Sequence, residues 1–456
     1  MLSTRQWLPG GGGQVGTAYK MHGSERDCYL GLDLGTSGCR VAAIDDAERV
    51  LMQVKISWPA AGTDPLTRPA LWWEVACRAL RCTAARLDGW VPRALAVDGT
   101  SGTVLLCDGH GDPLTEALPY YASGFLAEAQ CIDRVAPTGS TARGAGSALA
   151  RALHLLALVR EGQGVRVVNQ SDWLAAKLCG RIACDANNAL KLGYEPVSGH
   201  WPDWMDALAL PDAFLPEVVG PGTALASILP DRAAALGLPA DLLVVAGTTD
   251  SVAGVLAAGV SAPATAVTAL GSTLVLKLIT EEPVFAPQYG VYSHRLGNAW
   301  LAGGASNSGG AVLAQYFTVE ELEQLSPLLD PENDTGLDYY PLPRRGERFP
   351  QANPNLLPRL EPRPSQPHRF LQGMLEGIAR IEADGYRRLQ TLGAPYPVRV
   401  VSAGGGAANR AWSRIRERYL GVPVSVAQHQ EACVGTARLA RAGAGGHGLS
   451  SGRTES

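Results

Sequence analysis

The sequence predicts an α/β protein made of two similar domains that face each other across a cleft. The chain has 456 residues, 46% of them apolar, which is enough for two or three domains with large cores. Strand and helix patterns are interspersed along it. A glycine- and hydroxyl-rich turn between two strand patterns occurs near the start of each half, in residues 30–45 and in residues 266–280.

The first of these turns predicts an anion-binding hairpin. Residues 30–45 read LGLDLGTSGCRVAAID, which is an apolar strand, a Gly-Thr-Ser-Gly turn and a second strand. Gly35 and Gly38 let the backbone turn sharply and approach a ligand, while Thr36 and Ser37 add hydroxyls to the exposed amides. A plain hairpin with a Thr-Ser turn is the alternative that this stretch alone leaves open.

Asp33 ends the first strand of this hairpin, where its carboxylate would face the contents of the turn. A carboxylate beside phosphates usually implies a divalent cation, and magnesium is the natural candidate. A dinucleotide-binding loop is excluded because its glycines must lead into a helix, whereas Cys39 to Ile44 continues as a strand. A Walker A loop is excluded because no lysine follows a glycine. The remaining nucleotide-binding interpretation is a β-hairpin whose turn binds phosphate.

Composition favours small-molecule partners and a cytoplasmic location. Charged residues are 18% of the chain and the net charge is -4. The chain therefore lacks the excess of basic residues that binding to nucleic acid or an anionic membrane requires. The nine cysteines contain no Cys-x-x-Cys and are interpreted as reduced core thiols. The eight histidines show no ligand spacing, so any metal is expected to arrive with the substrate. No apolar run has the roughly 18 residues of a membrane span.

The two ends are expected to lie outside the fold. Residues 1–27 contain PGGGG at Pro9–Gly13 and no apolar signal core, which predicts a disordered leader. A true start at Met21 and a transit peptide both stay open. The polar tail, 447–456, contains GLSSG, which matches the nucleophile elbow of a serine hydrolase, but no strand precedes it.

Residues 94–114 repeat the pattern of the first hairpin, with Asp98, then Thr100 and Ser101, then an alternating strand. These side chains have no nearby cation and offer neutral hydrogen-bonding groups, which suits a polyol. Asp185, Asn187 and Asn188 follow in a polar loop, and ordinary turn chemistry explains them.

Helical spacing predicts further elements. In residues 71–87, Trp72 and Trp73 are interpreted as packing residues. Further helices are predicted at 148–159, from Ser171 or Asp172 to about 180, and at 410–420. Residues 341–367, rich in Pro and Arg, predict a surface loop.

The second half begins with a strand that ends at Asp250, followed by a small-residue helix from about Ser251. Capping that helix is the commonest task for an aspartate in this place. In residues 266–280, Gly271, Ser272 and Thr273 then stand where the first turn had its glycine and hydroxyls. Two such hairpins suggest a nucleotide held between two domains.

Glycine-rich strand ends recur at residues 301–308 and 400–409. A glycine run lets a flat base or a ribose approach the main chain, and Asn409 can hydrogen-bond an adenine or ribose edge.

With these motifs in order, the chain resembles the FGGY family of carbohydrate kinases, in the actin, Hsp70 and hexokinase superfamily. The resemblance covers about Cys28 to Ala442 and depends on DLGTSGCR, SDWLAAKLCGRIACDANNALKLG, AGTTDSVAGVLAAG, ALGSTLVLKL, RFLQGMLEGIAR and VSAGGGAANRAW. It implies two ribonuclease-H-like domains flanking a nucleotide cleft, formed by residues 28–257 with about 430–446 and by residues 258–429. It also implies phosphorylation of a terminal hydroxyl of a ketose or polyol with magnesium ATP.

The resemblance also implies roles for individual residues. Asp250 would be the general base, with Asp33 and Thr36 managing the metal and the phosphates, Asp33 directly or through water. The sugar would meet Asp33, Asp98, Ser101 and Asp250, and ATP would be bound by Gly35, Thr36, Ser37, Gly271, Ser272, Thr273, Gly405, Gly406, Asn409 and Trp412.

Residues 118–129, LPYYASGFLAEA, lack the family's usual Trp-Asn-Asp-type sugar contact. This departure favours the compact pentulose kinases, which look like D-ribulose kinases. D-Xylulose, glycerol and L-ribulose stay open as acceptors, as do a non-catalytic sugar sensor and an actin- or Hsp70-type ATPase. The protein is expected to be a monomer or a homodimer.

Overall fold

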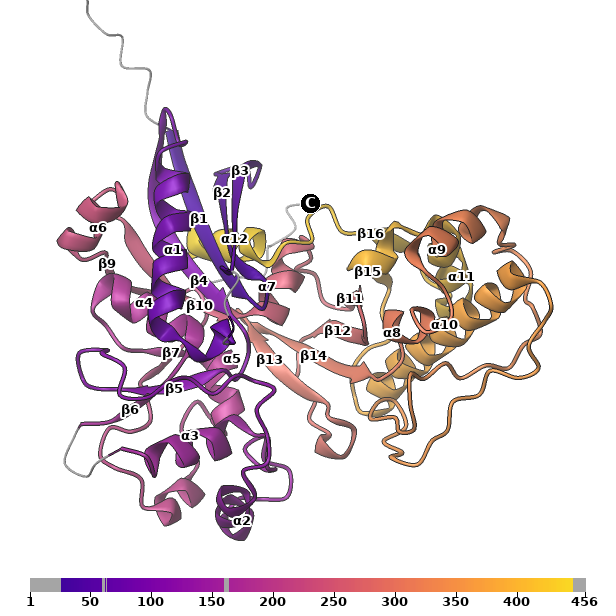
Figure 1. The fold of residues 1–456 in the computed structure, drawn as a ribbon, viewed down its shortest axis with the longest axis horizontal. Helices are drawn as coiled ribbons and strands as arrows, with labels where there is room; N and C mark the ends of the chain where they lie inside the picture. Colours follow the sequence, from indigo (N-terminus) through magenta and orange to yellow (C-terminus); the bar gives the residue numbers. More distant parts are fainter. Residues whose placement is uncertain (1–25, 60–61, 63, 160–163, 446–456) are drawn as a thin grey trace, which may run out of the picture.

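The computed structural model describes residues 26–59, 62, 64–159 and 164–445, and its strands gather into two large sheets (Figure 1). Most of the predicted leader and all of the predicted tail lie outside the described residues, although Arg26 and Asp27 already belong to the first strand. In the part of the chain that is described, no helix is both long and apolar enough to cross a membrane.

The first sheet has six strands in the order β3-β2-β1-β4-β10-β9. β1, β4 and β10 are parallel, whereas β2 and β3 pair antiparallel with their neighbours. The central strands are buried on both faces, as their nearly continuous apolar runs require. The strands are β1 (Arg26–Gly35), β2 (Gly38–Asp45), β3 (Val50–Ser57), β4 (Trp90–Gly99), β9 (Ala224–Ser227) and β10 (Leu243–Thr249).

Helices cover both faces of this sheet. On one face, α1, α4 and α6 contribute to a single apolar core with the strands, and Trp72 is fully buried in it. A smaller lobe holds two short sheets, β5 with β6 and β7 with β8, together with α2, α3 and α5. The elements are α1 (Pro69–Ala84), β5 (Val104–Cys107), α2 (Leu126–Val135), α3 (Ala148–Leu156), β6 (Arg166–Asn169), α4 (Gln170–Cys179), β7 (Cys184–Asp185), α5 (Ala186–Ala189), β8 (Val218–Val219) and α6 (Pro230–Leu236).

The second sheet has the order β13-β14-β12-β11-β15-β16, and its strands β14-β12-β11-β15-β16 repeat the topology of β3-β2-β1-β4-β10 in the first. The sixth strands, β9 and β13, lie on opposite edges. An antiparallel run, β11, β12 and β14, is followed by β15 and β16, which join parallel beside β11. The long helix α10 packs on one face with α8 and α11. The elements are β11 (Thr265–Leu270), β12 (Leu274–Thr280), β13 (Tyr292–Leu296), β14 (Ala299–Ser306), α8 (Gly310–Leu313), α9 (Val319–Leu325), α10 (Pro367–Thr391), β15 (Arg399–Ala403), α11 (Arg410–Leu420) and β16 (Val424–Val426).

Two helices lie between the sheets (Figure 1). α7 (Asp250–Ala257) and α12 (Ala432–Ala444) pack on the first sheet with one side and on the second sheet with the other. The last helix of the described chain therefore returns to the first domain. The repeated topology confirms the predicted pair of ribonuclease-H-like domains.

Two local predictions were wrong. Residues 94–114 do not form a hairpin, because β4 stays in the first sheet whereas β5 pairs with β6. Residues 341–366 contain no helix or strand, as predicted for a loop, and Pro367 begins α10. The segment is not all at the surface, because Leu342, Glu347 and Phe349 are buried. Phe349 fills the space over Gly304 and Gly385 in the core of the second domain.

Candidate active site

A cavity of about 330 Å³ opens at the carboxyl ends of β1, β4 and β10. This edge of a parallel sheet is where α/β proteins usually bind ligands. The structure brings the first turn and Asp250 together there, although they are far apart in sequence. The lining residues are Asp33, Gly35, Thr36, Ser37, Arg40, Thr100, Tyr120, Asp250, Gln430, Glu431 and Ala432.

The first turn has the predicted hairpin geometry. Gly35 pairs with Gly38, and Thr36 and Ser37 are exposed between them. Gly38 has a φ of 139°, and a Cβ there would lie 2.1 Å from the carbonyl oxygen of Ile56, so no other residue fits. The resulting turn presents two hydroxyls at the cavity, as a phosphate ligand requires.

Asp33 is held in a line of charged groups. Its neighbours in register are Arg40 on β2 and Asp98 on β4. Arg40 places Nη1 3.4 Å from Asp33 Oδ2 and Nε 3.1 Å from Glu431 Oε2. Burial raises the pKa of Asp33, and the Arg40 guanidinium opposes that rise. The arginine therefore favours an ionised Asp33 beside the turn.

Asp98 lies behind Asp33 and does not line the cavity. It is fully buried, and the hydroxyl of Thr436 donates to it. Burial and the charge of Asp33 raise the pKa of Asp98 well above its usual value. A side-chain hydrogen bond between Asp98 and Asp33 contributes to this rise and links the two carboxyl groups. Asp98 was predicted to contact the sugar, but this geometry makes it a support for Asp33.

Ser101, also predicted as a sugar contact, likewise lies outside the cavity lining, whereas its neighbour Thr100 is part of it. Gln170 holds Thr100 by accepting from its amide at 3.0 Å and from its hydroxyl at 2.9 Å. Arg151, buried without an ion pair among the described residues, donates to the carbonyls of Gly102 and Tyr120. These two side chains come from distant helices and fix this wall of the cavity.

Asp250 is the first residue of α7, and the N-cap position that was the alternative role for it belongs to Thr249. The Oδ1 atom of Asp250 accepts a 2.7 Å hydrogen bond from the amide of Ser251. Burial raises the pKa of Asp250 to about 6, helped by the charge of Asp33 and opposed by Lys191 and Lys277. A carboxylate with that pKa is ionised at neutral pH and basic enough to accept a proton.

The second turn is exposed and does not line this cavity. β11 and β12 form the predicted hairpin around it. The segment after β14 supports it, because Gly310 donates to the carbonyl of Gly271 at 2.8 Å and Ala311 to that of Ser272 at 3.0 Å. The prediction that both turns enclose one triphosphate is not tested by this arrangement.

Some of the predicted adenosine contacts are free to meet a ligand, whereas others already make contacts within the protein. A Cβ added at Gly405 would have no atom within 4 Å, so a flat group can approach the main chain there. Asn409 instead caps α11, accepting from the amide of Trp412 at 3.0 Å and donating to Ser326 at 2.8 Å. Trp412 is buried against Gly406. Asn409 and Trp412 therefore shape this strand end from within the protein.

Sequence reasoning missed Tyr120, Gln430 and Glu431 as cavity residues and gave Arg40 no role. Glu431 precedes α12 by one residue and reaches the first turn only because that helix returns to the first domain. Gln430 accepts a 3.0 Å hydrogen bond from the amide of Gly404 and so links the cavity to the second domain. Nothing in the local sequence marks these long-range partners.

Among the described residues, no group of three or more His, Cys, Asp and Glu side chains is arranged to hold a metal ion. A magnesium ion that arrives with a nucleotide needs fewer protein ligands. It usually binds one or two carboxylates and completes its coordination shell with phosphates and water. Asp33, beside the open turn, fits that requirement.

Comparison with known proteins agrees with this geometry. Residues 266–444 match the C-terminal domain of the FGGY family of carbohydrate kinases. These residues, which form most of the second domain and α12, belong to the FGGY family. The chain is 24% identical over 410 residues to a xylulose kinase of Escherichia coli K12, covering 85% of this chain and 84% of that relative. It is 26% identical over 480 residues to an autoinducer-2 kinase of Yersinia enterocolitica, covering 92% and 87%.

Solved structures share the fold of this chain. A xylulose kinase from Rhodospirillum rubrum superposes with a TM-score of 0.78 at 22% identity, covering 91% of this chain and 90% of that chain. A glycerol kinase from Plasmodium falciparum, solved with ADP, gives a TM-score of 0.79 at 15% identity, covering 92% and 90%. The fold is therefore that of the FGGY kinases.

Proposed function

We propose that this protein uses ATP to phosphorylate a terminal hydroxyl of a ketopentose, with D-ribulose as the first candidate and D-ribulose 5-phosphate as its product. One observation supports this most strongly. A carboxylate with a pKa raised to about 6, Asp250, shares a cavity with a glycine- and hydroxyl-rich turn and with Asp33. A base and a phosphate-binding turn in one cavity are what transfer to an alcohol requires.

In the proposed reaction, Asp250 accepts the proton of the sugar hydroxyl as that oxygen bonds to the γ-phosphorus and the bond to the β-phosphate oxygen breaks. The products are a sugar phosphate and ADP. Thr36 and Ser37 hold the phosphates, and Arg40 adds positive charge beside them. Phosphoryl transfer depends mostly on such positioning and charge neutralisation.

Asp33 would hold magnesium in this proposal, directly or through water. The ion supplies charge neutralisation for the phosphate oxygens. Gly271, Ser272 and Thr273 would meet the phosphates from the second domain, and Gly405 with Gly406 would accept the adenosine. Asp98 would keep Asp33 oriented through the side-chain hydrogen bond between them.

D-Xylulose is the second candidate, because relatives and structural neighbours of this chain carry the name xylulose kinase. The altered segment at residues 118–129 favours D-ribulose. Within it, Tyr120 lines the cavity, and the ring of Tyr120 packs edge-on against that of Tyr121, with ring centroids 5.1 Å apart. The wall that selects the acceptor is therefore aromatic and hydroxyl-bearing.

The experiment is a coupled assay of ADP release over D-ribulose, D-xylulose, L-ribulose and glycerol. Among these four neutral acceptors, we expect the highest kcat/KM with D-ribulose. Sugar binding without turnover would indicate a sensor instead, and slow ATP hydrolysis that no sugar stimulates would indicate an actin- or Hsp70-type ATPase. Sedimentation of the purified protein distinguishes the expected monomer from a homodimer.

We also infer a cytoplasmic location. The nine cysteines are all free in the structure, and most are buried. Such cysteines are typical of proteins that stay in a reducing compartment.

A further inference from the structure

A cluster of basic and aromatic side chains lies near Asp250 but outside the residues that line its cavity. Lys277 comes from β12, Tyr292 and His294 from β13, and Lys191 from the turn after α5 in the first domain. Lys277 and Tyr292 are both in register with Gly303 on the strand between them. A Cβ at Gly303 would lie 2.7 Å from the Lys277 side chain, so glycine leaves room for that lysine to cross the sheet.

The cluster joins the two domains. The ammonium of Lys191 donates to the phenol of Tyr292, and it lies 3.9 Å from the centre of that ring. Nearby, Asn187 donates to the carbonyl of Arg295 at 2.9 Å and accepts from its amide at 2.6 Å. The contacts of Lys191 and those of Asn187 therefore hold this part of the first domain against the second domain.

His294 provides a donor without an acceptor. Its Nδ1 lies 3.2 Å from the ammonium of Lys277, which can only donate, so Nδ1 accepts and Nε2 carries the ring proton. His294 is 1% exposed, and Nε2 has no hydrogen-bond partner. A buried donor left without a partner usually has a ligand or a water to bind.

The positive charge of the cluster is opposed by the carboxylate of Asp250, which lies beyond ion-pair distance. Among the described residues, neither Lys191 nor Lys277 forms an ion pair with a carboxylate, and Lys277 is 8% exposed. Burial lowers the pKa of Lys277 to about 8, and the two lysines lower that of Tyr292 to about 8. Buried charges in proteins are normally paired, which makes this arrangement unusual without a bound anion.

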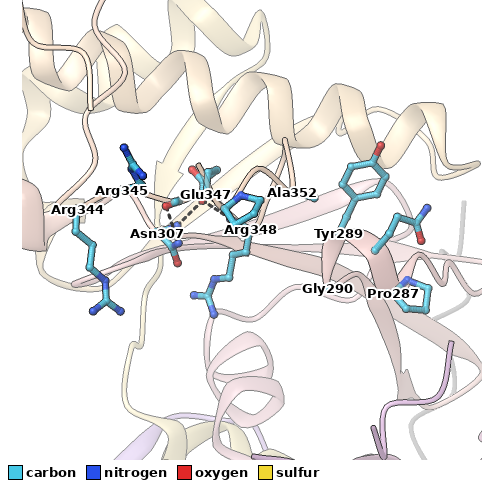
Figure 2. A pocket seen from close by; sticks show the side chains of 12 residues that line it. Pro287, Tyr289, Gly290, Asn307, Arg344, Arg345, Glu347, Arg348 and Ala352 are labelled. Atoms are coloured by element: carbon cyan, nitrogen blue, oxygen red, sulfur yellow. Dashed lines mark hydrogen bonds between the residues drawn. The ribbon is translucent and has the colours of Figure 1, made fainter. Parts of the chain in front are cut away.

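A second cavity, of about 710 Å³, contains further positive charge (Figure 2). It is lined by Arg344, Arg345 and Arg348, none of which forms an ion pair within the described part of the chain. Figure 2 shows Arg344 and Arg348 pointing to one side and Arg345 to the other. Arg348 also lowers the pKa of Tyr292, which places its charge near the cluster. Glu347 lines the same cavity, and its carboxylate accepts from the hydroxyl of Ser306 and the amide of Asn307.

We propose that Lys191, Lys277, Tyr292 and Arg348 form an anion-binding subsite for the end of the acceptor that is remote from the phosphorylated hydroxyl. The acceptor that this site prefers then carries a carboxylate or a phosphate group, rather than being a neutral pentulose. The inference rests on the proposed kinase function, since it takes Asp250 as the base at the reacting hydroxyl. The two lysines that face Asp250 would then meet the far end of a short sugar chain.

The test compares acceptors of matched length. D-Ribonate differs from ribitol in a terminal carboxylate, and D-ribulose 5-phosphate differs from D-ribulose in a phosphate. We expect kcat/KM to be at least tenfold higher for one charged acceptor than for its neutral partner. Whether ribonate or ribulose 5-phosphate shows the preference identifies the anion as a carboxylate or a phosphate.

Lys277→Met and Lys191→Met each remove one charge with little change in volume. We expect each to lower kcat/KM for the preferred charged acceptor at least tenfold more than for its neutral partner, because both acceptors share any effect on Asp250. Tyr292→Phe keeps both charges and should have a smaller effect. Lys55→Met, at an exposed position of β3, is the matched control and should change neither value.

Two outcomes would overturn the inference while leaving the kinase function intact. One is equal or better turnover of the neutral acceptors, and the other is a charge preference that both lysine variants retain. If no acceptor is phosphorylated, the proposed function itself fails. Calorimetric titration with D-ribonate and D-ribulose 5-phosphate then tests the anion-binding subsite by itself. Binding of either that Lys277→Met weakens at least tenfold supports the subsite, and no binding of either overturns it.

Discussion

Three aspartates near one cavity are placed in different electrostatic settings, which fits the separate tasks proposed for them. Asp98 is fully buried and its pKa is raised well above the usual value, and Asp33 is beside a guanidinium. Asp250 has a pKa of about 6 at the start of a helix. Because environments separate these pKa values, one residue type can serve as support, phosphate-side ligand and base.

The first prediction concerns Asp250→Asn. Asn keeps the hydrogen bond to the amide of Ser251 but cannot accept the sugar proton. We expect kcat/KM for the sugar to fall about 10²- to 10⁴-fold, while the affinity for ATP changes by less than about threefold. Asp212→Asn, at an exposed loop position, is the control for the chemical change.

The same residue predicts the pH dependence. Because the base must be ionised and its pKa is about 6, kcat/KM should fall about tenfold per pH unit below pH 6 and be flat just above it. In the Asp250→Asn protein this acid limb should be absent. A variant with normal turnover, or one that keeps the same limb, would remove the base assignment.

At the scale of single residues, the sequence predicted contacts between residues of one local motif. It missed contacts between residues that are far apart in the chain. Gly35, Thr36 and Ser37 lie in one turn, so their proximity follows from chain connectivity alone. Glu431 reaches Arg40 only through the return of α12, and Lys191 reaches Tyr292 only because two domains touch. No periodicity encodes such pairs.

At the scale of elements, a buried ion pair ties three parts of the second domain together. Arg416 on α11 donates to Glu382 on α10 at 2.6 Å and 2.7 Å, and to the hydroxyl of Ser402 on β15 at 2.5 Å. Both charged side chains are fully buried. The hydroxyl of Thr268 also donates to Glu382, at 2.6 Å, which extends the network to β11.

Arg416→Met should therefore be strongly destabilising, because it leaves the carboxylate of Glu382 buried without its cation. We expect the free energy of unfolding to fall by about 3–5 kcal/mol, measured by urea denaturation. The exposed pair of Arg387 and Asp384 is the control, and Arg387→Ala should change stability by less than about 0.5 kcal/mol. Equal effects of the two substitutions would contradict this assignment.

Element types were predicted better than element partners. The helix at 71–87 is α1, shifted by two or three residues, and the helix predicted from Ser171 or Asp172 begins at Gln170. The misassigned hairpin at 94–114 shows the limit, because Thr-Ser-Gly chemistry is local whereas strand pairing is not. Phe349 illustrates the same limit within a loop segment, since its burial depends on Gly304 and Gly385.

At the scale of the whole molecule, the two sheets are separated by α7 and α12, and the second turn is exposed away from the first cavity. The proposed reaction needs both turns on one triphosphate, with water excluded. Domain closure is the motion that would achieve this. The exposed faces of Ser272 and Thr36 are where closure would bring the domains together.

We therefore predict that sugar and nucleotide together compact the protein. Small-angle X-ray scattering should show a smaller radius of gyration with both ligands than with either one alone. A radius that stays unchanged when both ligands are bound would rule out closure as part of the cycle. The Asp250→Asn protein with both ligands provides a sample in which turnover does not deplete them.

The position of α12 also constrains how the chain acquires its shape during synthesis. Residues of this helix, including Cys433, Val434 and Ala437, fill one face of the first sheet together with Tyr29 and Ala94. A ribosome delivers those residues only after the entire second domain has emerged. The first sheet therefore has this face uncovered until the second domain and α12 have been translated. Chaperone protection during translation should for that reason matter most for the first sheet.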